Sequence, residues 1–382
     1  PDPGEICLWL CHHYALRLTA VIRVDFAMTQ PDKFTAHMLV ASAAGFASAA
    51  ASRLLENHPE VEEHFAPGGW NAWKNHYIQR IHELAAAVSA GVPEVFAGRT
   101  AWVLQTFASR EVPEDDLRIS LECLREVLDS ELPDPARAAV GPPLALAVSV
   151  LEDGPGDEGP AIDGKTRSGR IALEYLVSAL EGDSRSAIER VLKAIDDGMA
   201  LTEVYTGILL PVQKELGRMW QAGELSIAQE HLVTSTTQRL TAVLSFRGQA
   251  PEPRGLKALV AGVSGDVHDT ALRAFSNLLE AEGWQVICLG CDVPDTEIAA
   301  AADYFGVDLM MLSATLPQHL QAVEKSIAAV KDLEDRRIPV MVGGLAYLGT
   351  GDLWQRQGAD GHAASFEEAL ELAVRLAEPS DA

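Results

Sequence analysis

The sequence KALVAGVSGDVHDTA at residues 257–271 decides the fold of the C-terminal part. It begins as a short apolar run typical of a buried strand, and a polar Gly265-Asp266 turn follows at once. Similar runs occur at 284–289, 308–313 and 339–343, with helical patterns near 268–282, 294–305 and 318–335. Strands that alternate with helices predict a parallel sheet with right-handed crossovers over residues 255–377.

The loop after the first strand carries a candidate metal ligand, His268. Ligands of open parallel sheets bind outside the carboxyl ends of the strands. A neutral imidazole suits a first-row transition metal, and Asp266 could hold the other ring nitrogen. The same residues also fit an ordinary helix N-terminus, with Asp266 or Asp269 as the cap and His268 in solvent. The segment alone leaves both interpretations open.

Residues 265–271 resemble the Asp-x-His-x-x-Gly signature of cobalamin-binding domains, with Ala271 in place of the glycine. Two companion features of that family follow: Ser313-Ala314-Thr315 ends the third strand and Gly343-Gly344 ends the fourth. The resemblance implies a Rossmann-like cobalamin-binding domain in which His268 binds cobalt and the displaced nucleotide tail runs beside the sheet. The residues that it implies as cofactor contacts are Asp266, Asp269, Thr270, Ser313, Thr315, Gly343 and Gly344.

Residues 163–247 give four helical segments, with breaks at 182–183, 198 and 223. Trp220 is followed after nine residues by Glu230-His231. This spacing resembles the B12-dependent photoreceptors, in which a four-helix cap shields an adenosyl group on the upper corrin face. The resemblance implies that Trp220, Glu230 and His231 contact adenosylcobalamin. The alternative is that Trp220 is a core residue and that Glu230 only favours a helix N-terminus.

Gln221 departs from the repressor-type members of that family. They carry a histidine at this position, which can bind cobalt after illumination. An amide is a poor cobalt ligand, so a bis-histidine state is not expected here. Ser226 and Gln229 predict a capping box that opens the helix of Glu230.

Residues 28–152 are predicted to form an all-helical domain. Apolar residues recur at helical spacing over 36–55, 70–88, 93–108 and 114–132, and a linker is expected from 133 to 162 because of its prolines and its acidic end. Residues 1–27 are interpreted as an extension of undetermined status. The residues 159–166 match a P-loop pattern but follow an acidic linker instead of a strand, so nucleotide hydrolysis is not expected.

Three residues of the helical domain suggest a second chromophore. Trp73, His76 and Arg80 stand at i, i+3 and i+7 and so share one helix face. Flat rings beside cationic groups suit a linear tetrapyrrole with propionates. The order of the parts resembles the photocobilins, which pair B12 with a bilin, and this implies biliverdin in residues 28–152. A plain dimerisation bundle is the alternative.

Composition limits the partners. The net charge of −25 argues against nucleic acid, since phosphate binding needs clustered Lys and Arg. No apolar run approaches the roughly 18 residues that suggest a membrane span. Five cysteines without a paired framework favour reduced thiols and a cytoplasmic location.

These patterns together predict a light sensor instead of an enzyme. We expect that photolysis of adenosylcobalamin changes domain or subunit packing in a homodimer or higher oligomer, with the signal passing to a downstream protein that the sequence does not name. Two alternatives remain: a methyl-carrying corrinoid subunit of a methyltransferase system, and a B12 sensor that does not respond to light.

Overall fold

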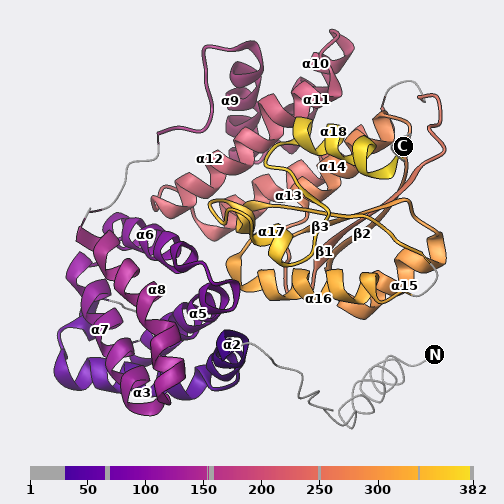
Figure 1. The fold of residues 1–382 in the computed structure, drawn as a ribbon. Helices are drawn as coiled ribbons and strands as arrows, with labels where there is room; N and C mark the ends of the chain where they lie inside the picture. Colours follow the sequence, from indigo (N-terminus) through magenta and orange to yellow (C-terminus); the bar gives the residue numbers. More distant parts are fainter. Residues whose placement is uncertain are drawn as a thin grey trace, which may run out of the picture.

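The computed structural model describes residues 31–64, 69–152, 154, 159–247, 251–333 and 336–378. Figure 1 shows three parts: a helical N-terminal domain, a helical cap beside it, and a sheet domain with helices on both faces. The interpretation of residues 1–27 lies outside the described residues.

The N-terminal domain is entirely helical in its described residues, as predicted. Its helices are α2 (Pro31–Ala41), α3 (Ala43–Asn57), α4 (Val61–His64), α5 (Gly69–Ala90), α6 (Pro93–Ser109), α7 (Glu114–Glu131) and α8 (Asp134–Glu152). No single described helix is long and apolar enough to cross a membrane; α2 and α3 meet the length and composition criteria only as a bent pair.

The linker predicted from residue 133 is wrong over its first part, because residues 134–152 form α8. Pro142 and Pro143 lie inside this helix. Each proline removes one backbone donor and normally disfavours a helix interior. Here the helix buries Ala136, Val140, Leu144 and Ala147 against the bundle. Burial of this apolar face offsets the missing hydrogen bonds.

The cap has four helical units, as predicted. They are α9 (Arg167–Leu180), α10 (Ser184–Asp196), the continuous run of α11 (Leu201–Val204), the π-helical η1 (Tyr205–Leu209) and α12 (Leu210–Gln221), and finally α13 (Ile227–Leu244). Gly182, Gly198 and Gly223 separate the units with φ of 84°, 91° and 71°. The predicted capping box of Ser226 and Gln229 opens α13. The P-loop-like residues form turns that end in Thr166, the N-cap of α9.

The sheet domain holds five parallel strands in the order β2-β1-β3-β4-β5. The strands are β1 (Lys257–Val263), β2 (Gln285–Val293), β3 (Leu309–Ser313), β4 (Val340–Gly343) and β5 (Gly361–His362). The first four were predicted. Strand β5 has only two residues, which is too short for a sequence pattern. Strand β2 lies on one side of β1, and β3 to β5 follow on its other side, so the order of the strands changes direction between β1 and β3. Ligands of open parallel sheets usually bind at this point.

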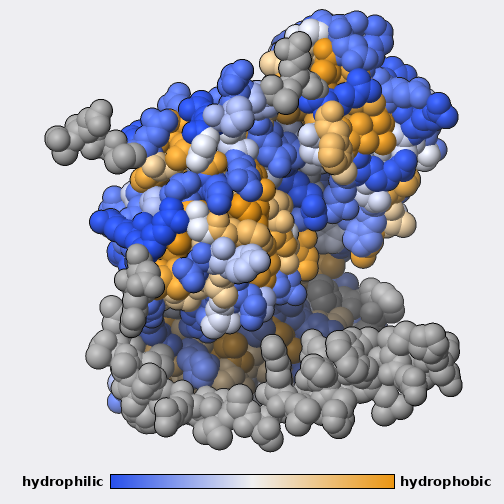
Figure 2. Space-filling view, turned by 90° about the vertical axis from the view of Figure 1, so that its right-hand side faces the viewer, coloured by the Kyte–Doolittle hydropathy of each residue, from blue (hydrophilic) through white to orange (hydrophobic). Residues whose placement is uncertain are grey.

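Helices cover both faces of the sheet (Figure 1). They are α14 (Thr270–Ala281), α15 (Asp295–Phe305), α16 (Leu320–Lys331), α17 (Leu353–Arg356) and α18 (Phe366–Ala377), with short 3-10 turns η2 (Pro317–His319) and η3 (Leu345–Tyr347). Figure 2 shows hydrophobic areas between hydrophilic side chains on one side of the molecule. Tyr304 and Phe305 at the end of α15 are among the exposed apolar residues of the described chain.

The N-terminal domain packs on both other parts. One hydrophobic core runs from its helices to one face of the sheet. Helix α5 contacts η2 and α16, and Arg356 Nη1 donates to the carbonyl of Ala90 at 2.7 Å. Lys33 forms an ion pair with Glu324. Helix α6 contacts α12 of the cap. The three parts therefore meet near the carboxyl edge of the sheet.

Candidate cobalamin site

His268 lies in the loop between β1 and α14, where its ring is oriented by Asp266. Oδ1 of Asp266 accepts hydrogen bonds from His268 Nδ1 at 2.7 Å and from the His268 backbone N–H at 3.0 Å. The Asp266 side chain is 1% exposed and that of His268 is 49% exposed. Because Nδ1 is engaged, Nε2 is the nitrogen left to bind a metal.

The second oxygen of Asp266 ties this loop to the end of β3. Oδ2 accepts from the Thr315 backbone N–H at 2.6 Å and lies 3.5 Å from His319 Nδ1. Burial would raise the pKa of Asp266, but hydrogen bonds from His268, His319 and Thr315 hold that pKa well below its usual range. The hydrogen bond that His268 donates to Asp266 in turn raises the pKa of His268, against the opposing effect of burial. A fixed carboxylate therefore makes this imidazole more basic.

The predicted residues at the strand ends lie side by side. The parallel register aligns Gly262 with Ser313 and Ser313 with Gly343. Ser313 is buried. Gly344 has φ of 104°, and a Cβ there would lie 2.2 Å from the carbonyl oxygen of Ala314. The backbone itself therefore requires glycine at 344, whereas a Cβ on Gly343 would meet nothing closer than 3.5 Å.

Asp269 and Thr270 stand at the start of α14. Asp269 is its N-cap residue but makes no side-chain cap bond; instead its Oδ2 lies 2.5 Å from Arg273 Nε. Gln238 Nε2 in the cap donates to Asp269 Oδ1 at 2.9 Å. Ala271, which replaces the glycine of the signature, is exposed in the first turn of α14. A side chain of α13 thus bridges the cap to the loop that holds His268.

Glu230 lies in the first turn of α13, the helix whose Gln238 bonds to the same loop. Oε1 of Glu230 accepts from Thr234 Oγ1 at 2.7 Å, and its Oε2 pairs with His231, whose side chain is 75% exposed. The negative charge of Glu230 is one of the causes that raise the pKa of His268. Glu230, Thr234 and Gln238 are spaced by four residues, so they share a face of α13. This spacing was available in the sequence, although Thr234 and Gln238 were not predicted.

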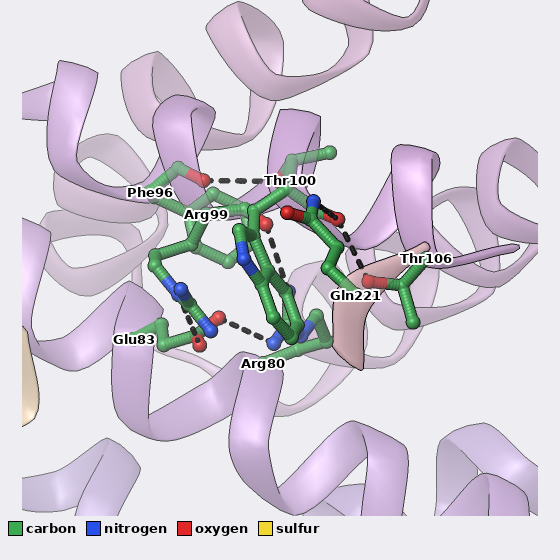
Figure 3. Close-up of polar contacts among 8 residues, drawn as sticks. Arg80, Glu83, Phe96, Arg99, Thr100, Thr106 and Gln221 are labelled. Atoms are coloured by element: carbon green, nitrogen blue, oxygen red, sulfur yellow. Dashed lines mark hydrogen bonds and ion pairs between the residues drawn. The ribbon is translucent and has the colours of Figure 1, made fainter. Parts of the chain in front are cut away.

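Trp220 lies in the last turn of α12, at the border with the N-terminal domain. Its ring stacks on Trp102 of α6, with centroids 5.9 Å apart and an interplanar angle of 20°. Gln221 is buried against α6, where its Nε2 donates to the carbonyl of Trp102 at 3.1 Å. Figure 3 shows Gln221 beside residues of α5 and α6. Trp220 is therefore an interdomain residue instead of a member of the cap core.

The three residues predicted for a bilin lie on one side of α5. Trp73 is fully buried and its ring centroid lies 5.4 Å from that of His76. Burial, together with the nearby charge of Arg80, lowers the pKa of His76 well below its usual value. Arg80 Nη2 lies 2.7 Å from Glu83 Oε2, and Glu83 Oε1 lies 3.0 Å from Arg99 Nε. Glu83, which was not predicted, thus neutralises Arg80 in this structure.

The chemistry of these groups fits a corrin. No group of three or more His, Cys, Asp or Glu side chains among the described residues could hold a free metal ion. A corrin brings its cobalt with four ring nitrogens, so a single half-exposed imidazole is enough on the protein side. A hollow of about 870 Å³ between α13 and α14 has Gln238 and Asp269 in its lining, but contains none of Trp220, Glu230 or His268.

Comparison with known proteins identifies the two C-terminal parts. Residues 256–374 match the family model "B12 binding domain", and residues 172–245 match a second model of the same description. The HTH-type transcriptional repressor CarA of Myxococcus xanthus is 33% identical over 177 residues, which cover 44% of this chain and 55% of CarA. The chain thus spans about half the length of that relative.

Corrinoid proteins are also similar to this chain. Corrinoid protein DSY3155 of Desulfitobacterium hafniense is 26% identical over 209 residues, covering 53% of this chain and 95% of that protein. Among solved structures, the monomethylamine corrinoid protein of Methanosarcina barkeri matches with a TM-score of 0.46 and 21% identity, over 54% of this chain and 98% of that one. The helical cap and the Rossmann-like domain of this chain therefore match B12-binding domains, and these two parts are the region that it shares with corrinoid proteins.

Proposed function

We propose that this protein is a light sensor that binds adenosylcobalamin between α13 and the His268 loop. The observation that carries the proposal is the contact of α13 with the His268 loop: Gln238 of the cap donates to Asp269, the residue after the candidate cobalt ligand, at 2.9 Å. The similarity to CarA and CarH, two repressors of Myxococcus xanthus, adds support. Bound adenosylcobalamin supplies a cobalt–carbon bond that light can break.

On the lower side, the roles follow from the hydrogen bonds of Asp266. His268 would hold cobalt through Nε2 while Asp266 fixes its tautomer. Because Asp266 also accepts from the Thr315 backbone, the carboxylate keeps its orientation when the imidazole gives up its proton at Nε2. Ser313, Thr315, Gly343 and Gly344 lie at the adjoining strand ends, where the nucleotide tail of the cofactor would run.

On the upper side, Glu230 is held by Thr234 and His231 extends into solvent. These polar groups suit the hydroxyls of the ribose in an adenosyl ligand, and the Trp220 indole offers an apolar wall. A methyl or hydroxo ligand would reach none of them. Loss of the adenosyl group would remove the ligand that the three side chains share, and the packing of the cap would change.

The alternative is a methyl carrier, and the corrinoid relatives favour it by their coverage: the chain spans 95% of the Desulfitobacterium protein. A carrier must present the upper corrin face to substrate enzymes. Here α6 packs against the end of α12 and stacks on Trp220, so a site that uses Trp220 would be closed on that side. A sensor that does not respond to light would share the closed site, so illumination decides between them.

The test compares the apoprotein loaded with adenosyl-, methyl- or hydroxocobalamin. Absorption spectra and particle size are recorded in the dark and after green light, with His268→Ala as the control for lower ligation. We expect a change of size only for the adenosyl form after illumination. A size that never changes with light would favour the light-independent sensor, and equal affinities for all three forms would favour the carrier.

We further propose that the N-terminal domain binds a bilin such as biliverdin. The support is the set of Trp73, His76 and Arg80 on α5, in which Trp73 and Arg80 are buried and His76 is partly buried. A propionate would have to take the place of Glu83 as the partner of Arg80. Full-length protein produced with biliverdin should therefore turn green, and Arg80→Ala should reduce the uptake without changing the cobalamin spectrum. If the full-length protein takes up no biliverdin, the bilin proposal is wrong, and dimerisation remains as the alternative function of this domain.

A further inference from the structure

We propose that Trp102 of α6 is a positioning residue for the upper face of the cobalamin site, so that the N-terminal domain completes the site that selects an adenosyl ligand. This inference rests on the proposed role of Trp220 in the cap. It goes further because it places a determinant of ligand choice more than a hundred residues away, in a domain that neither B12-binding match includes.

The first observation is the ring stack. Trp102 and Trp220 lie nearly parallel, 5.9 Å apart, and both are only half-buried. The guanidinium of Arg110 lies 5.2 Å from the Trp220 ring, so α6 contacts this indole from two positions. A half-buried tryptophan without such contacts would sample several rotamers. The stack restricts Trp220 before any ligand arrives, which lowers the entropic cost of binding.

The second observation is the backbone clamp on the same turn. Ser109 Oγ donates to the Gln221 carbonyl at 2.6 Å, and Arg110 donates to the carbonyls of Gln221 and Trp220 at 3.2 and 3.3 Å. The Gln221 side chain contacts the Trp102 carbonyl and Gln105 Oε1, the latter at 2.5 Å. The end of α12 is therefore fixed by side-chain and backbone bonds to a single helix of the other domain.

The third observation is the support behind Trp102. The Arg99 guanidinium lies 4.4 Å from the Trp102 ring, and its Nε lies 3.0 Å from Glu83 Oε1. Glu83 also pairs with Arg80, and both side chains are buried in α5 (Figure 3). A buried ion pair has few alternative arrangements. The position of Trp102 is thus set by α5 as well as by its own helix.

This arrangement also accounts for Gln221. A residue whose amide is docked on α6 and whose side chain is 7% exposed cannot turn toward the corrin. The position after Trp220 then serves as an interdomain tether instead of a metal ligand. Gly223 fits the same contact, since a Cβ there would lie 3.4 Å from the Ser109 carbonyl and its φ is 71°.

The experiment compares Trp102→Ala, Trp102→Phe and Trp220→Ala with a control, Trp70→Ala, which removes a tryptophan that bonds to Ser52 within the N-terminal domain. Two quantities are measured on the full-length chain: the affinities for adenosyl- and hydroxocobalamin, and the exciton couplet of a stacked tryptophan pair in the circular dichroism of the apoprotein. Trp102→Ala and Trp220→Ala should both remove the couplet, and Trp70→Ala should keep it.

Trp102→Ala should weaken adenosylcobalamin binding about three- to tenfold, the range of an aromatic pair, and leave hydroxocobalamin binding within about twofold. Trp102→Phe should retain most of the preference. If Trp220→Ala removes the preference but Trp102→Ala does not, the positioning role is wrong and the cap proposal stands. If Trp220→Ala itself keeps the preference, the cap proposal is wrong. Should Trp102→Ala fail to fold, Ser109→Ala tests the same clamp, and an unchanged preference in it would contradict the inference.

Discussion

The two sides of the candidate cobalamin site are built in different ways. On the lower side, Asp266 and His268 are two residues apart; Asp266 accepts two hydrogen bonds from His268 and a third from the Thr315 backbone. On the upper side, Trp220 depends on Trp102, which is separated from it by a whole domain boundary. In the proposed site, metal ligation would thus be a local property of one loop, whereas ligand selection would depend on tertiary packing. Substitutions on the lower side should therefore weaken the binding of all cobalamins alike. Substitutions on the upper side should weaken mainly the binding of adenosylcobalamin.

The largest effect is expected from His268→Ala. Loss of the ligand removes the metal bond itself, so affinity for adenosyl-, methyl- and hydroxocobalamin should fall by more than roughly 100-fold, beyond the range for outer-shell residues. Isothermal titration and the absorption spectrum of the bound cobalt measure this. An unchanged spectrum would mean that another residue binds cobalt, and the lower side would then not be a property of the His268 loop. His37→Ala is the control for loss of an exposed histidine, because His37 lies on α2 outside the proposed site.

Asp266→Asn should have the next largest effect. An amide keeps the shape but loses the charge that holds the His268 proton, so we expect a loss of about 10- to 100-fold for every cobalamin form. Asp303→Asn, on the exposed side of α15, controls for the loss of one negative charge. A loss confined to the adenosyl form would mean that Asp266 acts on the upper face, against the local character of the lower side.

Binding should also depend on pH through His268. Its pKa is raised by Asp266, so the proton that competes with cobalt leaves only above the ordinary histidine value. Affinity should therefore fall as the pH is lowered through this raised pKa, and the fall should begin above about pH 6.5. In Asp266→Asn the fall should move to lower pH. Spectral titrations between pH 5 and 8 test this, and a midpoint that does not move would contradict the role of the carboxylate.

The pH dependence of apoprotein stability has two parts with opposite signs. The depressed pKa of Asp266 contributes stability above the unfolded value of about 4, which is lost as the pH falls below it. The raised pKa of His268 contributes stability below about pH 6.5, which is lost as the pH rises through the folded value. Urea unfolding across this range should show the second loss in the wild type and not in His268→Ala.

The smallest effect is expected from Gln238→Ala. It removes one partly solvated hydrogen bond between the cap and the His268 loop, worth about 0.5–1.5 kcal/mol at most. Cobalamin affinity should drop no more than about tenfold, whereas Arg239→Ala on the same helix should change little. A loss as large as that of Asp266→Asn would show that the cap orients the loop, and the lower side would then not be local.

The sequence was a good guide where structure is local and a poor one where it is not. Strands β1 to β4 and the Asp266–His268 pair were predicted because each depends on neighbouring residues. Helix α8 was missed because its prolines were taken as breaks, although its small apolar residues recur at helical spacing. The Trp102–Trp220 stack leaves no sequence signal, since two residues in different domains meet only through packing. The ion pair of Glu83 did leave a sequence signal, because Glu83 stands three residues after Arg80 on the same helix.

The hydrophobic core that α5 shares with β3 and β4 has a consequence for how the protein unfolds. The N-terminal helices and one face of the sheet bury their side chains in one cluster, while the cap has a cluster of its own that reaches only α14 and α18. Residues in one cluster open together, so amides of α5 and β3 should exchange with solvent at matching rates. The cap should open separately and more often. If cobalamin binds between the cap and the sheet domain as proposed, it would bring the two units to a common rate.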